Sequence, residues 1–239
     1  MSKPSSPKNP MQPLVAMRAM GRLLKNPQAT EEVFIIIRAL SGDAVARGYR
    51  RFITTEHAGS ILSAETSLLE VLSDRVALQK LPEGSLGRAY LSFMEQGNIT
   101  AEGLKQASEV SEMEAEISSP EMKIYALRLR DQHDLWHVAT GFGRDVAGEA
   151  CLLAFTYAQT KNRGIGFIGM MGAFKLRRVF GRRFFSSMWQ AYQMGRRTQW
   201  LPGQYWEQRL SQPLERVRDE LGIKKPDRYT SLPLELVSA

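Results

Sequence analysis

Apolar residues in this chain recur at intervals of three and four positions, which is the spacing of one face of an α-helix. The clearest stripe is made of Val33, Ile36, Ile37 and Leu40. Thr30 precedes it as a candidate N-terminal cap, with Glu31 and Glu32 in the first turn. Gly42 marks the expected end of this helix.

Similar stripes predict helices along the rest of the chain. Ser119, Pro120 and Glu121 are the strongest start signal, because they suit the cap, the first position and the first turn. That helix continues through Ile124, Leu127 and Arg128. One further helix is predicted through Met17, Met20, Leu23 and Leu24 and ends before Pro27, and another runs along Tyr90, Phe93 and Met94. A short helix is predicted after a cap at Thr100. The remaining predicted helices span residues 60–73, 149–160, 190–197 and 213–221.

No stretch alternates apolar and polar residues as a half-buried strand does, and no internal repeat is visible. The sequence therefore predicts an all-α fold. With 239 residues and 43% hydrophobic content, one core is expected. We predict a disordered tail over residues 1–12, which are rich in Ser, Pro, Lys and Asn. A single helical domain should span residues 13–230, and residues 231–239 should form a C-terminal tail.

The formal net charge of +7 favours an anionic partner, such as nucleic acid, an anionic membrane surface or a phosphorylated ligand. Nucleic acid is the least favoured of these, because no known nucleic-acid-binding motif accompanies the charge. The single cysteine, Cys151, excludes a disulfide within the chain and is expected to be a buried small apolar residue.

The first thirteen residues lack the apolar core of a signal peptide and the arginine-rich pattern of an organellar presequence. No window reaches the roughly 18 apolar residues that a spanning helix needs. We therefore predict a bacterial-type cytoplasmic protein, peripheral on the inner face of the membrane.

His133 and His137 carry the candidate chemistry. Four positions apart on a helix, their imidazoles share one face and could bind one metal ion. Asp134 lies at the edge of that face, and Glu149 is a fourth candidate ligand. The alternative is an ordinary surface pair or a satisfied core pair of histidines, which is the more frequent meaning of this spacing alone.

Glu149 can join the histidines only if the chain reverses direction. On one straight helix, the Cα atoms of His137 and Glu149 would lie roughly 18 Å apart. Gly141 and Gly143 offer a break, since each weakens a helix by roughly 1 kcal/mol. Gly148 would allow another backbone to approach closely.

Two imidazoles with carboxylates suit Zn(II) or a redox metal such as Fe(II) better than Mg(II), which prefers oxygen ligands. We expect Zn first, with Fe or Mg as alternatives. The motif differs from that of zinc proteases, because position 134 is Asp rather than Glu.

Residues 165–174 are apolar and spaced with glycine, and a dense basic cluster follows them. This pattern favours equally an interfacial helix on an anionic membrane and a core helix whose arginines face water. Met170 and Met171 could line a prenyl tunnel, although ordinary core is the more frequent role. The basic cluster contains Lys175, Arg177, Arg178, Arg182 and Arg183.

The order His-Asp-x-x-His, eleven residues, then Glu resembles the coenzyme Q biosynthesis family numbered four. The resemblance extends from about Pro13 to Tyr229. It includes the stretch Leu81 to Tyr90, which reads Leu-Pro-Glu-Gly-Ser-Leu-Gly-Arg-Ala-Tyr with Ser for the family's Thr. Further matches are Gly195-Arg196, Trp206-Glu207, Leu221-Gly222-Ile223 and Tyr229. Residues 164–185 and the end beyond Tyr229 are unmatched.

The resemblance implies an all-helical fold that binds a polyprenyl lipid, with a metal held by His133, Asp134, His137 and Glu149. It also implies that a hydroxyl replaces the ring carboxyl of a polyprenyl hydroxybenzoate, an oxidative decarboxylation in which these four residues are catalytic. Asp134 could instead orient an imidazole. The expected partners are a polyprenyl lipid or quinone precursor, other quinone biosynthesis enzymes, an anionic membrane surface and a second copy of the chain.

Three classes of function remain open on the sequence. The first is the metal-dependent decarboxylase, and the second is a non-catalytic lipid-binding scaffold that organises a quinone biosynthesis complex. The third is a basic nucleic-acid-binding domain, which would show tight, salt-sensitive binding.

Overall fold

The computed structural model describes residues 10–26, 29–97 and 119–233. Within these ranges the fold is all-α, as predicted, and contains no β-strand beyond one isolated bridge between Ser85 and Pro213. The helices of the first half are α1 (Pro13–Lys25), α2 (Thr30–Ser41), α3 (Ala44–Phe52), α4 (Ala58–Leu62), α5 (Leu68–Ser73), α6 (Arg75–Gln79) and α7 (Leu86–Gln96). Those of the second half are α9 (Pro120–Asp131), α10 (His133–Thr140), α11 (Val146–Thr160), α12 (Arg163–Phe180), α13 (Arg182–Arg197), η2 (Leu201–Gly203), α14 (Trp206–Arg209), α15 (Leu214–Leu221) and α16 (Asp227–Thr230).

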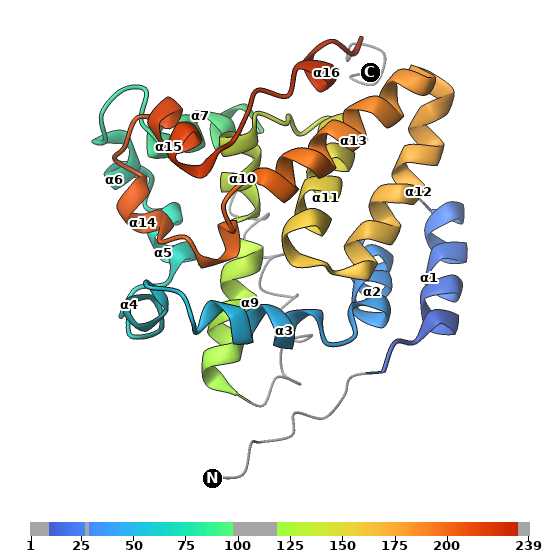
Figure 1. The fold of residues 1–239 in the computed structure, drawn as a ribbon, viewed down its shortest axis with the longest axis horizontal. Coiled ribbons are helices and arrows are strands. Elements are labelled where there is room, and N and C mark those ends of the chain that lie inside the picture. Colours follow the sequence, from blue (N-terminus) through green and yellow to red (C-terminus); the bar gives the residue numbers. More distant parts are fainter. Residues whose placement is uncertain (1–9, 27–28, 98–118, 234–239) are drawn as a thin grey trace.

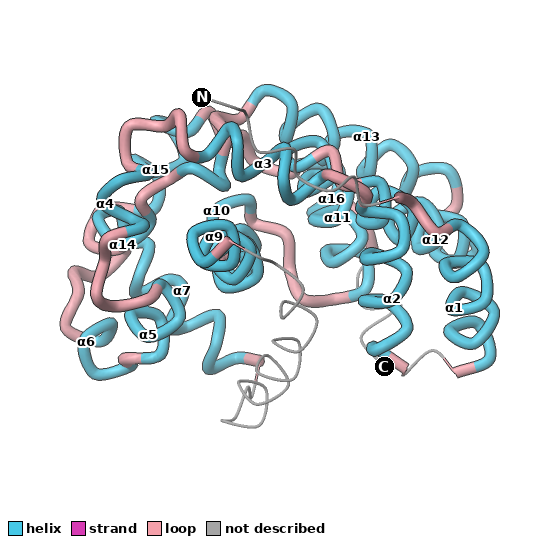
Figure 2. The backbone as a smooth tube through the Cα atoms, turned by 90° about the horizontal axis from the view of Figure 1, so that it is seen from below, coloured by secondary structure: helices cyan, strands magenta, loops and turns pink. Residues whose placement is uncertain are grey.

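Helices α9 and α10 lie in the middle of the molecule. The short helices α4 to α7, α14 and α15 lie on one side of them, and the long helices α11, α12 and α13 lie on the other (Figures 1 and 2). Helix α2 packs between α1 and α12. Both α7 and α15 pack against α10, so elements far apart in sequence enclose this central helix.

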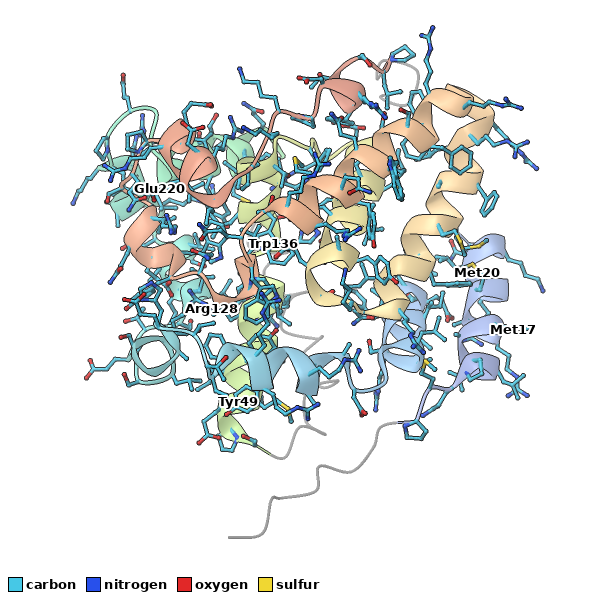
Figure 3. The ribbon with its side chains drawn as sticks, viewed as in Figure 1. Met17, Met20, Tyr49, Arg128, Trp136 and Glu220 are labelled. Carbon is cyan, nitrogen blue, oxygen red and sulfur yellow. The ribbon has the colours of Figure 1, made fainter. Side chains whose placement is uncertain are left out.

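The main core joins the side chains of these two sides around α10 and α11, including Trp206, Phe155 and Leu135. Cys151 is buried in it, as expected. A smaller cluster between α1, α2 and α12 contains Ile36 and Met20. Met20 points into this cluster, whereas Met17 on the same helix is 68% exposed (Figure 3).

Several predicted boundaries agree with the structure, and one helix was predicted wrongly. The expected single helix over 60–73 is two helices, α4 and α5, separated by residues 63–67. The cause is Ser67, whose hydroxyl accepts from the amide of Glu70 while the Glu70 carboxylate accepts from the amide of Ser67. This reciprocal cap starts a new helix. Thr30 is the first residue of α2 rather than its cap, which is Ala29.

The described residues include only part of the two segments predicted to be tails, residues 1–12 and 231–239. The amide of Gln12 donates to the carbonyl of Ala39 at 2.7 Å, which attaches the start of α1 to α2. Leu232 is buried in the main core. The tail predicted over 1–12 lies mostly outside the described residues, as do the cap predicted at Thr100 and residues 234–239. The domain limits stay predictions.

Replacing Ser67 by alanine is expected to lower the free energy of unfolding by about 1 kcal/mol, the usual effect of losing an N-terminal cap. Urea denaturation measures the difference. Ser63→Ala is the matched control, because the Ser63 hydroxyl makes only an exposed contact of 3.4 Å with the carbonyl of Ser60. Equal losses in the two variants would contradict the role of the cap.

Candidate metal centre

His133 and His137 lie on the same face of α10, and their ring centroids are 4.8 Å apart. The two side chains differ in exposure: that of His137 is fully buried, whereas that of His133 is 42% exposed. One imidazole therefore belongs to the core and the other reaches the surface.

The chain reverses between α10 and α11, as the sequence prediction required. Gly141 ends α10 with φ of 77°, a left-handed conformation that glycine adopts at little cost. Asp145 then caps α11 by accepting from the amides of Ala147 and Gly148. The reversal places Glu149 in the first turn of α11, with its Oε1 atom 3.3 Å from Nε2 of His137.

Gly148 permits this turn because the backbone of residue 143 passes directly over it. A Cβ atom at position 148 would lie 2.8 Å from the carbonyl carbon and amide nitrogen of Gly143, closer than real Cβ atoms approach. The neighbouring atoms belong to backbone and cannot rotate away. The close approach expected from the sequence is therefore present.

Tyr229 fixes the same turn from the far end of the chain. Its hydroxyl accepts from the amide of Gly143 at 2.9 Å and donates to the carboxylate of Asp145. Burial, with the hydrogen bond and charge of Asp145, raises the pKa of the Tyr229 phenol, so the phenol keeps its proton. A residue more than eighty positions away thus sets the path between the two candidate ligand helices.

Arg218 on α15 holds the C-terminal end of α10. Its guanidinium donates to the carbonyls of Val138 and Ala139, both at 2.9 Å. These carbonyls belong to the last turn of α10, where hydrogen-bond acceptors have no partner within the helix. The contact fixes α10 against α15 next to the reversal.

The segments around positions 81–90 and 206–207 also have structural roles. The amides of Leu86 and Gly87 donate to the carbonyls of Gln212 and Leu210, which docks the start of α7 on the C-terminal segment. Buried Arg128 forms a bidentate ion pair with Glu207 at 2.6 and 2.7 Å, where α9 meets the first turn of α14 (Figure 3). These contacts fix α7 and α9 to the segment from Glu207 to Gln212.

Three of the predicted ligands come together. The candidate ligand atoms of His133, His137 and Glu149 all lie within 4.8 Å of one another. The donor set is two imidazoles and one carboxylate, a combination that binds Zn(II) or Fe(II).

The hydrogen bonds of His137 fit a metal ligand. Its Nδ1 atom lies 3.0 Å from the carbonyl oxygen of Phe142, and because a carbonyl only accepts, Nδ1 carries the proton. In the neutral ring, Nε2 then offers a lone pair. This atom is buried, has no hydrogen-bond partner among the described residues and faces the Glu149 carboxylate. Two acceptors at this distance need a positive charge between them, which a proton or a metal ion could supply.

Asp134 stands outside this group of three and contacts His133 instead. Its Oδ1 atom lies 3.3 Å from Nδ1 of His133, which suits the orienting role that the sequence left open. Burial lowers the pKa of the His133 imidazole, but the hydrogen bond and charge of Asp134, with the charge of Glu149, outweigh it and raise the pKa. Burial raises the pKa of Asp134, but His133 and Arg144 together lower it.

Sequence reasoning missed two side chains beside the centre. The ring of Phe93 on α7 stacks on His137 at 5.4 Å, and the guanidinium of Arg144 lies 4.1 Å above Phe93. Phe93 was assigned only to an apolar stripe, and no local signal distinguishes such a residue from ordinary core. Asp145 was also missed, although an aspartate directly before a helical stripe is a recognisable cap.

An apolar cavity adjoins the centre. It is lined by Val45, Tyr125, Leu129 and Ile165 and, on the side of α10, by Trp136 and His133. The cavity volume is about 80 Å³, small beside the roughly 300–1,000 Å³ that is usual for small-molecule sites. His133 therefore belongs both to the candidate metal centre and to the cavity wall.

Comparison with known proteins assigns the chain to a family. The family model for Coenzyme Q (ubiquinone) biosynthesis protein Coq4 matches residues 7–227. This chain belongs to the Coq4 family. It is therefore a protein of ubiquinone biosynthesis, and the resemblance seen in the sequence is confirmed.

Individual relatives agree with this assignment. The mouse protein named ubiquinone biosynthesis protein COQ4 homolog, mitochondrial, is 29% identical over 93% of this chain and 82% of its own length. The relative of the same name from Aedes aegypti is 33% identical over 62% of this chain and 52% of its own length. A crystal structure from Nostoc punctiforme, named for ubiquinone biosynthesis, has the same fold with a TM-score of 0.65. The two sequences are 21% identical, and the structural match covers 90% of this chain and all of the Nostoc chain.

The predicted location was wrong. Relatives from mouse and Aspergillus flavus are named mitochondrial, which contradicts a bacterial-type cytoplasmic assignment on the inner face of a membrane. The prediction rested on the first thirteen residues, whereas the match to the family comes from the folded domain. A targeting segment is separate from the folded domain, so the fold itself does not determine the subcellular location.

Among the described residues, no helix combines the length and the apolar character needed to cross a membrane.

Proposed function

We propose that this protein catalyses the oxidative decarboxylation of a polyprenyl hydroxybenzoate, replacing the ring carboxyl by a hydroxyl. The observation that carries the proposal is the group of two imidazoles and one carboxylate beside an apolar cavity. A metal-binding group that shares His133 with the wall of an apolar cavity suits a substrate with a polar aromatic head.

The reaction has to balance in atoms and electrons. One carboxylic acid, one O₂, two electrons and two protons give one phenol, one CO₂ and one water. The bond between the ring and the carboxyl carbon breaks, and a bond between the ring and oxygen forms. The proposal therefore names O₂ as the oxidant and a two-electron reductant as co-reactant.

His133, His137 and Glu149 would hold the metal. When bound, it would supply Lewis acidity toward substrate oxygen atoms and, if it is Fe(II), the ability to react with O₂. Phe142 would keep the proton of His137 on Nδ1 through its carbonyl, and Asp134 would orient His133. Phe93 would exclude water from the buried side of His137.

The choice of metal follows from the chemistry. Zn(II), the first expectation from the sequence, has no redox activity. Two histidines and one carboxylate are the donor set of non-haem Fe(II) oxygenases, so the oxidative step favours Fe(II) in this proposal. Mg(II) would require more oxygen donors than the three residues offer.

A non-catalytic scaffold is the alternative proposal, and the surface of α12 and α13 supports it. Large apolar side chains on these helices are exposed, including Phe174 at 52% and Val179 at 45%. The basic side chains at 175, 177 and 178 are exposed beside them. Exposed apolar area next to positive charge suits contact with anionic lipid or with other quinone biosynthesis proteins. A second copy of the chain could cover the same surface.

The decisive test is turnover by the purified chain loaded with Fe(II) or Zn(II). A polyprenyl hydroxybenzoate, a reductant and ¹⁸O₂ are added, and the product is analysed by mass spectrometry. The expected result is a product that has lost CO₂ and gained one ¹⁸O atom with Fe(II), and no such product with Zn(II).

Other outcomes separate the alternatives. Prenyl lipid that co-purifies with the protein, with no turnover under either metal, would contradict the reaction and favour the scaffold. Neither lipid nor turnover, together with salt-sensitive binding of DNA or RNA, would contradict both proposals.

A further inference from the structure

Arg144 lies in the turn between α10 and α11, immediately before the residue that caps α11. Its side chain extends back over α7, where the guanidinium carbon lies 4.1 Å from the centroid of Phe93. Phe93 in turn stacks on His137. Phe93 therefore contacts both the cation of Arg144 and the candidate ligand His137.

The N–H groups of this guanidinium have few strong hydrogen-bond acceptors among the described residues. Its Nη2 atom contacts the thioether sulfur of Met94 at 2.9 Å, which is a weak acceptor, and lies 3.9 Å from the Asp134 carboxylate, beyond hydrogen-bond range. Its Nε atom is buried without a hydrogen-bond partner in the described part of the chain. A partly buried guanidinium with unused donors favours an anionic ligand, which can accept two parallel hydrogen bonds.

The guanidinium of Arg144 occupies space that is free because position 97 is glycine. A Cβ atom at Gly97, which ends α7, would lie 2.8 Å from the guanidinium carbon of Arg144. Any larger residue at position 97 would displace the arginine. The side chain of Arg144 is nevertheless 23% exposed, so a ligand can reach it.

The charges around the site point the same way. Asp134 and Glu149 place two carboxylates beside the histidines, and both would repel an anionic substrate. Arg144 is the cation that faces Asp134. Its positive charge offsets the negative charge of Asp134, which lowers the cost of bringing in another carboxylate.

We propose that Arg144 binds the carboxylate of an aromatic acid at the metal centre and so selects an acid over the corresponding phenol. The identity of the acid as a hydroxybenzoate rests on the proposed function. The binding role rests on the contacts of Arg144 itself. Arg144 is here a specificity-determining residue, because it contacts the group that distinguishes substrate from product.

The test measures affinities by calorimetry with the full chain, whose metal content is determined in each preparation. The probes are 3-geranyl-4-hydroxybenzoate and the matched neutral 2-geranylphenol, which lacks only the carboxylate. In Arg144→Met, affinity for the acid is expected to fall at least about tenfold, since hydrogen bonds between charged groups contribute about 1.5–3 kcal/mol. Affinity for the phenol should stay within about twofold.

Two further variants make the result specific. Arg144→Lys is expected to recover only part of the affinity for the acid, because an ammonium cannot form the two parallel bonds of a guanidinium. Arg50→Met, on the exposed face of α3, is the matched control and should change neither affinity. Metal content should be the same in all of them.

The assignment is overturned if Arg144→Met weakens both ligands equally or neither, or if the native chain does not prefer the acid. Selective loss of the acid together with an absence of turnover would contradict the proposed reaction while supporting the role of Arg144. Turnover that persists with an unchanged KM in Arg144→Met would support the reaction and contradict the role of Arg144.

Discussion

Replacing His137 by alanine is expected to lower the affinity of the protein for its metal by more than about a hundredfold and to abolish turnover. Even residues that only support a ligand typically contribute about 10–100-fold in metal affinity. His137 contributes more, because its Nε2 atom faces the Glu149 carboxylate and its Nδ1 proton is fixed by Phe142. Elemental analysis after dialysis and a metal titration measure the effect.

His57 provides the matched control. It is the remaining histidine of the three in the chain, and it lies next to Tyr205, away from α10. His57→Ala should keep both metal and turnover. Unchanged metal content and unchanged turnover in His137→Ala would contradict the metal centre and, with it, the proposed reaction.

Gly148→Ala should produce the largest loss of stability of any methyl addition near the site. The new Cβ atom would lie 2.8 Å from backbone atoms of Gly143, so either the turn or α11 must move. Overpacking of this kind costs about 1–3 kcal/mol and occasionally more. Because Glu149 follows directly, the movement should also separate Glu149 from His137 and weaken metal binding. Thermal unfolding with and without metal measures both effects.

Gly21→Ala is the control for this substitution. Gly21 lies within α1, and a Cβ atom there would meet nothing within 4 Å. Alanine is favoured over glycine in a helix by roughly 0.5–1 kcal/mol, so this variant should be slightly more stable than the native chain. If Gly148→Ala were as stable as Gly21→Ala, that result would contradict the close approach of the backbones at Gly148 and Gly143.

The candidate site could be located in the sequence because part of it is local. Two histidines four positions apart share a face on any helix, and α10 is a helix. The position of Glu149 followed from a constraint: a straight helix could not bring it near His137, and the glycines in between allowed a turn. That conditional prediction was correct, and the structure gives 3.3 Å between the two side chains.

The remaining parts of the site depend on packing between distant segments. Phe93 looks like any apolar residue of a helical stripe, and only the docking of α7 on α10 stacks it against His137. Tyr229 matched the family pattern without a stated role, and the fold shows it bound to Gly143 and Asp145. The break between α4 and α5 was missed for a different reason, since the signal of Ser67 and Glu70 is local and could have been recognised.

The sequence by itself determined the all-α class, the histidine pair and the family resemblance, because helix periodicity and motif spacing are properties of neighbouring residues. The tertiary structure decided which candidate ligands meet. It groups His133, His137 and Glu149, leaves Asp134 at the side of His133, and places Arg144 over Phe93. The physical reason is that these distances depend on how α7, α10, α11 and α15 pack. That packing is fixed by contacts such as Tyr229 to Asp145, which join residues far apart in the chain.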